Sequence, residues 1–393
     1  MKTGVQPTYI KTLLIIARII VGVLFIFSGV VKADDPLGLS YKMQEFFEAW
    51  GWTFLNDFSL LMSILMIAFE IIAGVAVLLG WRMKLFSWLL LLLILFFTFL
   101  TSYVVFSGKI RTCGCFGDCI PLTPHQTFTK DIILTLLIFF IFRNRSSIRP
   151  LFKPAISVVL LLAATIFAFA SQAYMLKHLP VVDCLPWKPG KNVLAQMKSP
   201  PGSLPDSIVI TFTYTKNGKE VKFISPHFPA DFDESIYHLV SKDEKMIREG
   251  NDIPPIKDFS LTTLGGTDTT EALLSAPGYA AILFVKGDIE HAEDWLTALA
   301  GINANILMPH HIPFYIVSSD GALADSYFNH NREPVKGIVL KCDYVAIKTA
   351  ARANPTLYLL KEGTIINKWG YADFEKASKD INQLVTGNPR SGQ

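Results

Sequence analysis

Long apolar runs in the first 176 residues constrain this chain more than any other feature. Four runs are clear, at residues 13–31, 58–79, 85–106 and 155–176, and a fifth at 132–142 is shorter. A helix needs about 20 apolar residues to cross a hydrocarbon core about 30 Å thick. We therefore predict five transmembrane helices. The first is expected to be retained, because its apolar core is too long for a cleaved signal peptide.

The basic residues of segment 143–153 predict how these helices are oriented. This segment carries Arg143, Arg145, Arg149 and Lys153 without an acidic residue, which marks a cytoplasmic loop by the positive-inside rule. Five spans then place the N-terminus in the cytoplasm and everything after residue 177 outside. All five cysteines fall on that outer side, where disulfides persist. We predict a bacterial inner-membrane protein with a periplasmic C-terminal domain.

The outer loop between the third and fourth runs concentrates the cysteines. Cys113, Cys115 and Cys119 lie within seven residues of one another. A Cys113–Cys115 disulfide would be strained and reactive, whereas Cys119 could pair in a more relaxed way with Cys115 or with Cys184, which follows the fifth run. Two alternatives stay open, a zinc-type site with His125 as fourth ligand and a turn without chemistry. We favour the disulfide interpretation, name these four cysteines as catalytic candidates and predict no metal.

Two charged residues lie inside the apolar runs. Arg18 is about 12 Å from the cytoplasmic end of the first run at 1.5 Å per residue, and Glu70 lies at a similar depth in the second. An intramembrane charge is costly and is usually paired, so we predict an Arg18–Glu70 ion pair. Our first interpretation is a structural pair that sets helix packing, and the alternative is a proton or quinone site. Between these two runs, residues 41–52 read as an amphipathic helix at the membrane interface.

Three motifs in the first 145 residues carry a resemblance to a known family. They are Ser28-Gly29 with Lys32, Glu70 with Gly74 and Leu78-Leu79-Gly80, and Cys113-Gly114-Cys115-Phe116-Gly117. Over about residues 10–145 the chain resembles the DoxX/MauE group of small membrane proteins. The resemblance implies a four-helix membrane domain and a setting in quinol-linked or thiol redox, or in the maturation of periplasmic enzymes such as methylamine dehydrogenase. The fifth run has no counterpart in that group.

The part of the chain after residue 177 has ordinary globular composition. Residues 207–225 alternate around Lys216-Asn217-Gly218-Lys219 and predict a hairpin. From residue 258 the order strand, helix, strand, X-Pro, hairpin, helix resembles the thioredoxin fold of periplasmic disulfide-handling proteins, with Pro355 at the position of its cis proline. The chain departs from that family after the strand 279–285, because residues 285–291 contain no Cys-x-x-Cys. We therefore expect a binding or docking module without dithiol chemistry.

These observations lead to one division of the chain and two functional hypotheses. The expected parts are a membrane domain (1–150), a fifth transmembrane helix (151–177), an extended linker with the hairpin (178–257) and a thioredoxin-like domain (258–393). The first hypothesis is a redox-associated protein that supports disulfide or electron exchange, or maturation of periplasmic enzymes. The second is a non-catalytic scaffold of a larger envelope complex, and a transporter ranks third. The expected partners are the bilayer and either periplasmic clients or membrane subunits. A net charge of +3 does not suggest nucleic-acid binding, and no cofactor is assigned, although a quinone is a candidate.

Overall fold

The computed structural model describes residues 7–387 with short gaps. Those gaps are residues 109, 111–113, 115–116, 205–206, 217, 226, 230–231, 234–235, 249, 251, 288, 290–291 and 331–333.

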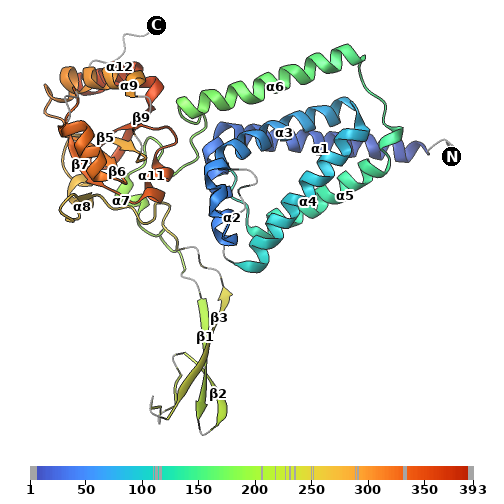
Figure 1. The fold of residues 1–393 in the computed structure, drawn as a ribbon, viewed down its shortest axis with the longest axis horizontal. Helices are drawn as coiled ribbons and strands as arrows, with labels where there is room; N and C mark the ends of the chain where they lie inside the picture. The colour runs from blue at the N-terminus through green and yellow to red at the C-terminus, as the bar shows by residue number, and fades with distance from the viewer. Residues whose placement is uncertain are drawn as a thin grey trace.

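Within the described residues, five helices are long and apolar enough to cross a membrane, which confirms the predicted spans. They are α1 (Thr8–Asp34), α3 (Ser59–Leu79), α4 (Met83–Ser107), α5 (Pro124–Arg143) and α6 (Pro154–Lys177). Figure 1 shows the axes of α1, α3 and α6 roughly aligned and those of α4 and α5 inclined to them, with the start of α1 at the end away from the α/β domain. A sixth helix, α2 (Pro36–Trp50), lies across the end of the bundle that faces the α/β domain. The sequence predicts an interfacial helix at this position.

Helices α1 and α3 approach one another closely because glycines face each other where they cross. A methyl group on Gly74 would lie 2.9 Å from the carbonyl oxygen of Gly22 and 3.0 Å from the backbone nitrogen of Ile26. Neither distance leaves room for a side chain, so glycine is required for this spacing. Small residues at such crossings let helix backbones pack tightly inside a bilayer.

The C-terminal part is an α/β domain built on a mixed sheet. Within the described residues the strand order is β4-β7-β6-β5-β8-β9. The strands are β4 (Thr262–Thr263), β5 (Tyr279–Val285), β6 (Phe314–Ser318), β7 (Ile338–Lys341), β8 (Thr356–Lys361) and β9 (Thr364–Gly370). Strands β5, β6 and β7 are parallel, whereas β8 and β9 form an antiparallel hairpin beside β5. The nearly continuous apolar runs of β5 and β8 are typical of strands that are covered on both faces.

Helices cover both faces of this sheet. Helices α9 (Ala292–Ile302) and α12 (Phe374–Thr386) pack on one face around the buried Trp295. The second face is covered by α7 (Val193–Gln196), α8 (Thr270–Leu274) and α11 (Tyr344–Ala350), and a short helix α10 (Gly321–Asp325) follows β6. The Asn354–Pro355 peptide bond directly before β8 is cis. The order of strands and helices and this proline confirm the predicted thioredoxin-like fold.

The segment after α6 differs from the extended surface linker that we expected. Trp187 is 2% exposed and stacks edge-on against Phe259 in the core of the α/β domain. The backbone of Gly190 donates to the carbonyl of Ile365, and the backbone of Val193 donates to the carbonyl of Gly363. This segment therefore belongs to the packed domain. The Pro-rich composition predicted an irregular path but gave no sign that the path is buried.

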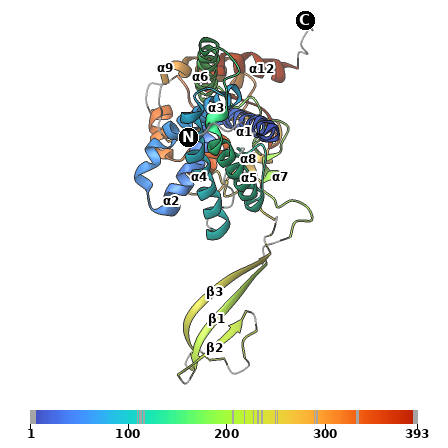
Figure 2. The same cartoon turned by 90° about the vertical axis from the view of Figure 1, so that its right-hand side faces the viewer.

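The predicted hairpin forms part of a three-stranded arm in the described chain. Strand β1 (Ser207–Lys216) pairs with β2 (Lys219–Ile224), with Lys216 opposite Lys219, and on its other side with β3 (His238–Arg248). Figures 1 and 2 both show this arm projecting away from the rest of the molecule. Strand β3 falls in a region for which the sequence gave no prediction.

Candidate functional site

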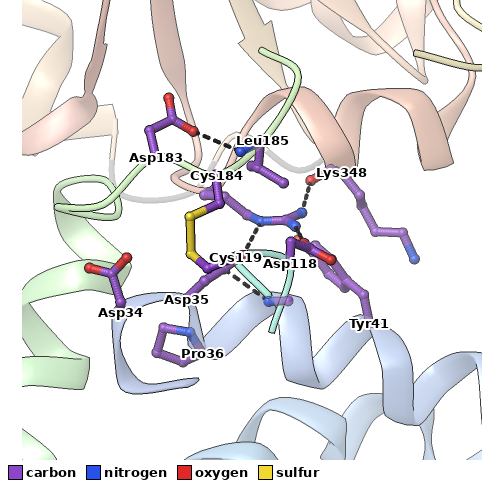
Figure 3. Close-up of polar contacts among 12 residues, drawn as sticks. Asp34, Asp35, Pro36, Tyr41, Asp118, Cys119, Asp183, Cys184, Leu185 and Lys348 are labelled. Carbon is purple, nitrogen blue, oxygen red and sulfur yellow. Dashed lines mark hydrogen bonds and ion pairs between the residues drawn. A yellow bond between two sulfur atoms is a disulfide. The ribbon is translucent and has the colours of Figure 1, made fainter. Parts of the chain in front are cut away.

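A disulfide joins the two halves of the molecule at the end of the bundle that faces the α/β domain. It links Cys119, in the loop between α4 and α5, to Cys184, which follows α6, with a Cα–Cα distance of 4.9 Å. Figure 3 shows this bond beside the start of α2. Of the pairings that the sequence left open, this is the one present. Cys113 and Cys115 lie outside the described residues, so their predicted role stays a prediction.

Arg352 of the α/β domain forms ion pairs with Asp118, in the loop that carries Cys119, and with Asp35, at the start of α2. Its Nε lies 2.7 Å from Asp35 Oδ2 and its Nη2 lies 3.1 Å from Asp118 Oδ2, directly before Cys119 in the chain. Its Nη1 donates to the carbonyl of Lys348. Burial lowers the pKa of Arg352, but Asp35 and Asp118 more than offset this and raise the pKa above its ordinary value. The guanidinium is therefore a permanent cation that fixes the two carboxylates.

Two consecutive aspartates connect α1, α2 and the disulfide segment. Asp34 accepts hydrogen bonds from the backbone nitrogens of Val181 and Val182, which lie just before Cys184. Asp35 accepts one from the backbone nitrogen of Gly38 and so caps α2. An aspartate at this position satisfies an otherwise unpaired helix N–H group. The junction between α1 and α2 thus hydrogen-bonds the segment that carries Cys184 and also forms an ion pair with Arg352.

Lys286 occupies the position after β5 where thioredoxin-like proteins carry Cys-x-x-Cys. Its backbone nitrogen donates to Asn354 Oδ1, and its Nζ donates to the hydroxyl of Tyr41 in α2 at 3.0 Å. Burial, followed by the charge of Arg352, lowers the pKa of Lys286 to about 7. Lys348 adds a second contact, from its Nζ to Gln44 Oε1 at 2.9 Å. The edge that is reactive in thioredoxins is therefore docked against α2 in this protein.

The remaining described cysteine takes no part in this cluster. Cys342 is 7% exposed and packs in the core of the α/β domain. Burial raises the pKa of its thiol to about 12. Because the thiolate is the nucleophile in exchange reactions, a thiol with so high a pKa is inert near neutral pH.

The charged residues inside the bundle are paired differently from our prediction. Arg18 donates from Nε to the carbonyl of Val77 and from Nη2 to the carbonyl of Leu78, at the end of α3. Glu70 instead forms an ion pair with Lys32 at 2.6 Å and accepts a hydrogen bond from Ser28. The structure therefore does not bring Arg18 and Glu70 together.

Helix register explains this correction. The crossing of α1 and α3 places Gly22 against Leu78 and Gly29 against Ile71. Arg18 consequently meets the end of α3, and Glu70 meets the C-terminal end of α1. The Lys32 side chain, at the end of the first apolar run, is only 3% exposed.

A second ion pair, between the partly exposed Lys130 and the buried Asp131, lies nearby. Lys130 Nζ is 3.0 Å from Asp131 Oδ1, and Asp131 Oδ2 accepts a hydrogen bond from Thr101. One small pocket is lined by Ser28, Lys32, Glu70, Lys130 and Asp131 together with apolar residues. The sequence signal for this cluster is that all five polar positions lie in or at the ends of apolar runs.

A metal site finds no support in the described part of the chain. No group of three or more His, Cys, Asp or Glu side chains there could hold an ion. His125 is exposed in the first turn of α5. The two other cysteines of the alternative zinc-type set lie outside the described residues, so the expectation of no metal stays a prediction.

Comparison with known proteins finds similarity over parts of the chain. A 128-residue stretch is 30% identical to Protein TlpB of Flavobacterium psychrophilum, covering 32% of this chain and 35% of that protein, so the chain aligns with about a third of that relative. A solved structure of the Xanthomonas campestris bacterioferritin comigratory protein matches with a TM-score of 0.25 and 17% identity, covering 34% of this chain and 92% of that one. Residues 10–143 match the family of the methylamine utilisation protein MauE. The membrane part of this chain is therefore MauE-like.

Proposed function

We propose that this protein supports thiol–disulfide exchange on the outer side of a bacterial inner membrane, in the maturation of periplasmic enzymes of the methylamine-utilisation type. The observation that carries the proposal is the Cys119–Cys184 disulfide, because Cys119 belongs to the same short loop of the sequence as Cys113 and Cys115. Both bonded cysteines are partly exposed. A thiolate from a client can therefore reach one of the two sulfurs.

The exchange step needs no group besides the dithiol of the client and the Cys119–Cys184 disulfide of this protein. A client thiolate attacks one sulfur of the Cys119–Cys184 bond and forms a mixed disulfide. The second client thiol then displaces that sulfur, so the client leaves oxidised while Cys119 and Cys184 become thiols. Two electrons and two protons pass from the client to the loop. Arg352, through Asp118, holds the backbone next to Cys119 while the bond is open.

The α/β domain acts in this proposal as a docked partner of the loop. It has no dithiol after β5, and its reactive-edge position carries Lys286, which contacts α2. Client recognition therefore falls to other surfaces of the outer part. The arm formed by β1, β2 and β3 is one such surface, because it projects into the open (Figure 2).

Cysteine variants in the full-length protein test this proposal. A Cys119→Ser/Cys184→Ser variant is expected to leave periplasmic clients reduced, as measured by trapping their thiols with a maleimide reagent that adds mass. Cys342→Ser is the matched control, because its buried thiol cannot exchange, and it should oxidise clients like the parent protein. The proposal would be refuted if the Cys119→Ser/Cys184→Ser variant and a Cys113→Ser/Cys115→Ser variant both oxidised clients to the same extent as the parent protein.

A scaffold function is the second candidate. It is favoured by the α/β domain, whose dithiol position is replaced by Lys286 and whose edge is used for docking. In that case the disulfide is a structural tether. The cysteine variants would then leave client oxidation unchanged, while membrane or periplasmic subunits would still co-purify with the protein.

A further inference from the structure

The disulfide crosses the interface between the α/β domain and the membrane bundle. Cys119 lies in the loop between α4 and α5, whereas Cys184 belongs to the segment that packs into the α/β domain. Directly before Cys184, Asp183 Oδ2 lies 2.8 Å from Lys368 Nζ in β9. Three residues after it, Trp187 is buried in the core of that domain. The two bonded cysteines are therefore anchored to different halves of the molecule.

Arg352 holds the Cys119 side of this interface without a covalent bond. It lies between α11 and β8 of the α/β domain, and its Nη2 is 3.1 Å from Oδ2 of Asp118, the residue before Cys119. Its Nε is 2.7 Å from Asp35 Oδ2, and its side chain is only 6% exposed. Hydrogen bonds between ionised groups are about twice as strong as neutral ones. These contacts therefore fix the cysteine loop relative to the domain that carries Cys184.

Asp34 holds the Cys184 side of the same interface. Its carboxylate, at the end of α1, accepts hydrogen bonds from the backbone nitrogens of Val181 and Val182 at 2.9 and 3.2 Å. These two residues come shortly before Cys184 in the chain. The contacts of Asp34 and Arg352 thus keep the two cysteine-bearing segments side by side in a way that does not depend on the bond between the sulfurs. Two thiols held in this way meet at a high effective concentration, which favours the disulfide over the dithiol.

We propose that Arg352 is a positioning residue that sets the reduction potential of the Cys119–Cys184 disulfide, because it holds the cysteine loop against the domain that carries Cys184. The inference rests on the proposed thiol exchange and names how that site is regulated. With the α/β domain docked, the disulfide resists reduction. With the domain undocked, the two thiols separate and the disulfide becomes a stronger oxidant. Reduction must in turn weaken docking by the same factor, because the coupling of two equilibria is reciprocal.

An electrostatic role for Arg352 would shift the reduction potential in the opposite direction. A cation beside a thiol favours the thiolate and so stabilises the reduced form. Loss of such a cation would make the disulfide harder to reduce. The Arg352 guanidinium, however, is already paired with the carboxylates of Asp35 and Asp118, so this group as a whole offers a thiolate no net positive charge. The positioning effect therefore dominates, and loss of Arg352 should make the disulfide easier to reduce.

Redox titration of the full-length protein in detergent tests the proposal. In glutathione buffers of known composition, two glutathione thiols give up two electrons and two protons to the Cys119–Cys184 bond and become glutathione disulfide. Free thiols are then trapped with a maleimide, and mass spectrometry of the Cys119 and Cys184 peptides gives the reduced fraction. Arg352→Met should shift the equilibrium about 10-fold toward the dithiol, the loss of one charge-assisted hydrogen bond. That factor raises the reduction potential by about 30 mV.

Two further variants separate positioning from loss of charge. Arg352→Lys keeps the cation but loses the planar fork that reaches both carboxylates, so it should shift the equilibrium in the same direction by a smaller factor. Lys361→Met is the matched control, because it removes one cation of the α/β domain at an exposed site whose ring contact, with Tyr279, lies within that domain. It should leave the reduction potential unchanged.

Hydrogen exchange gives the reciprocal measurement. At constant pH, reduction of the parent protein should speed the exchange of the α2 amides, because docking weakens when the disulfide opens. Exchange of the β5 amides should stay the same in the parent protein and in the Arg352 variants, which would show that the α/β domain remains folded.

Two results would overturn the proposal. One is an unchanged or lowered reduction potential in both Arg352→Met and Arg352→Lys, and the other is equal exchange of the α2 amides in the oxidised and reduced parent protein. If Arg352→Met does not fold, Arg352→Lys decides. Neither measurement needs a client. A raised potential in a protein that oxidises no client would therefore reject the proposed function and leave the role of Arg352 standing.

Discussion

At the scale of single residues, the Lys32–Glu70 pair places two opposite charges in the buried interior of the bundle. Both side chains are almost fully buried inside a helix bundle, and Ser28 adds a hydrogen bond to Glu70. The mutual attraction of a buried pair roughly offsets the cost of removing both charges from water, whereas loss of one partner leaves an uncompensated charge. The pair therefore ties the outer end of α1 to α3.

Truncating one partner should be far worse than replacing both. We expect Glu70→Ala to lower the free energy of unfolding by about 3–5 kcal/mol. The double variant Lys32→Met/Glu70→Met should recover most of that loss, since no charge stays buried. Unfolding of the purified protein in mixed detergent micelles measures both. A double variant as unstable as the single one would contradict the prediction.

The same residues show what the sequence could and could not predict about the candidate site. Intramembrane position alone identified Arg18 and Glu70 as residues that need partners. Their partners depend on the register of α1 against α3, which the Gly22–Gly74 crossing sets. A helix wheel cannot supply that register. The Cys119–Cys184 bond was among the pairings left open, because topology put both cysteines on one side of the membrane.

At the scale of elements, the close approach of α1 and α3 makes a prediction of its own. Gly74→Ala should destabilise the bundle, because the added methyl group would lie within 3.0 Å of backbone atoms that cannot move aside. Gly301→Ala in α9 is the matched control, since its nearest neighbour is a side-chain atom of Asn305 at 4.0 Å. There the better helix propensity of alanine should stabilise by up to about 1 kcal/mol. Thermal unfolding should show a lower midpoint temperature for Gly74→Ala than for the parent protein and an equal or higher one for Gly301→Ala.

The docking of the α/β domain on α2 depends on pH through Lys286. Tyr41, Arg352, Asp35 and Lys348 face this lysine, and burial, followed by the charge of Arg352, lowers its pKa from 10.5 to about 7. Between pH 7 and 10.5 the undocked form therefore holds a proton that the docked form has lost. A rise in pH through this range favours the docked form.

From pH 7 to pH 9 the docked form should gain on the order of 1–2 kcal/mol relative to the undocked form. Hydrogen exchange of the α2 amides, corrected for the intrinsic effect of pH, reports the change. Lys286→Met should abolish this dependence, and Lys361→Met, at an exposed site in β8, should keep it. If the corrected exchange were slower at pH 7 than at pH 9, docking would weaken as the pH rises, which would contradict the prediction.

At the scale of the whole molecule, apolar length and strand order predicted the broad architecture. Five spans, the interfacial helix and strand β5 appear where the sequence placed them, because each is a local pattern. The packed course of residues 185–197 and strand β7 were missed. Burial of Trp187 depends on a sheet face built by residues 60 and more positions later. Such long-range contacts leave no periodic trace in the sequence.

The contacts between the two halves require the cysteine loop and the α/β domain to share one side of the membrane. We expect that side to be the periplasm, because of the basic segment 143–153.

After mild reduction of spheroplasts, a membrane-impermeant maleimide should label Cys119 and Cys184, which are partly exposed. Cys342 should react only after denaturation, since it is 7% exposed and its thiol has a raised pKa. A cysteine placed at Ser146, between α5 and α6, should be labelled only after the membrane is permeabilised. Labelling of Ser146→Cys in intact spheroplasts, with Cys184 protected, would invert the orientation and place the disulfide in the reducing cytoplasm.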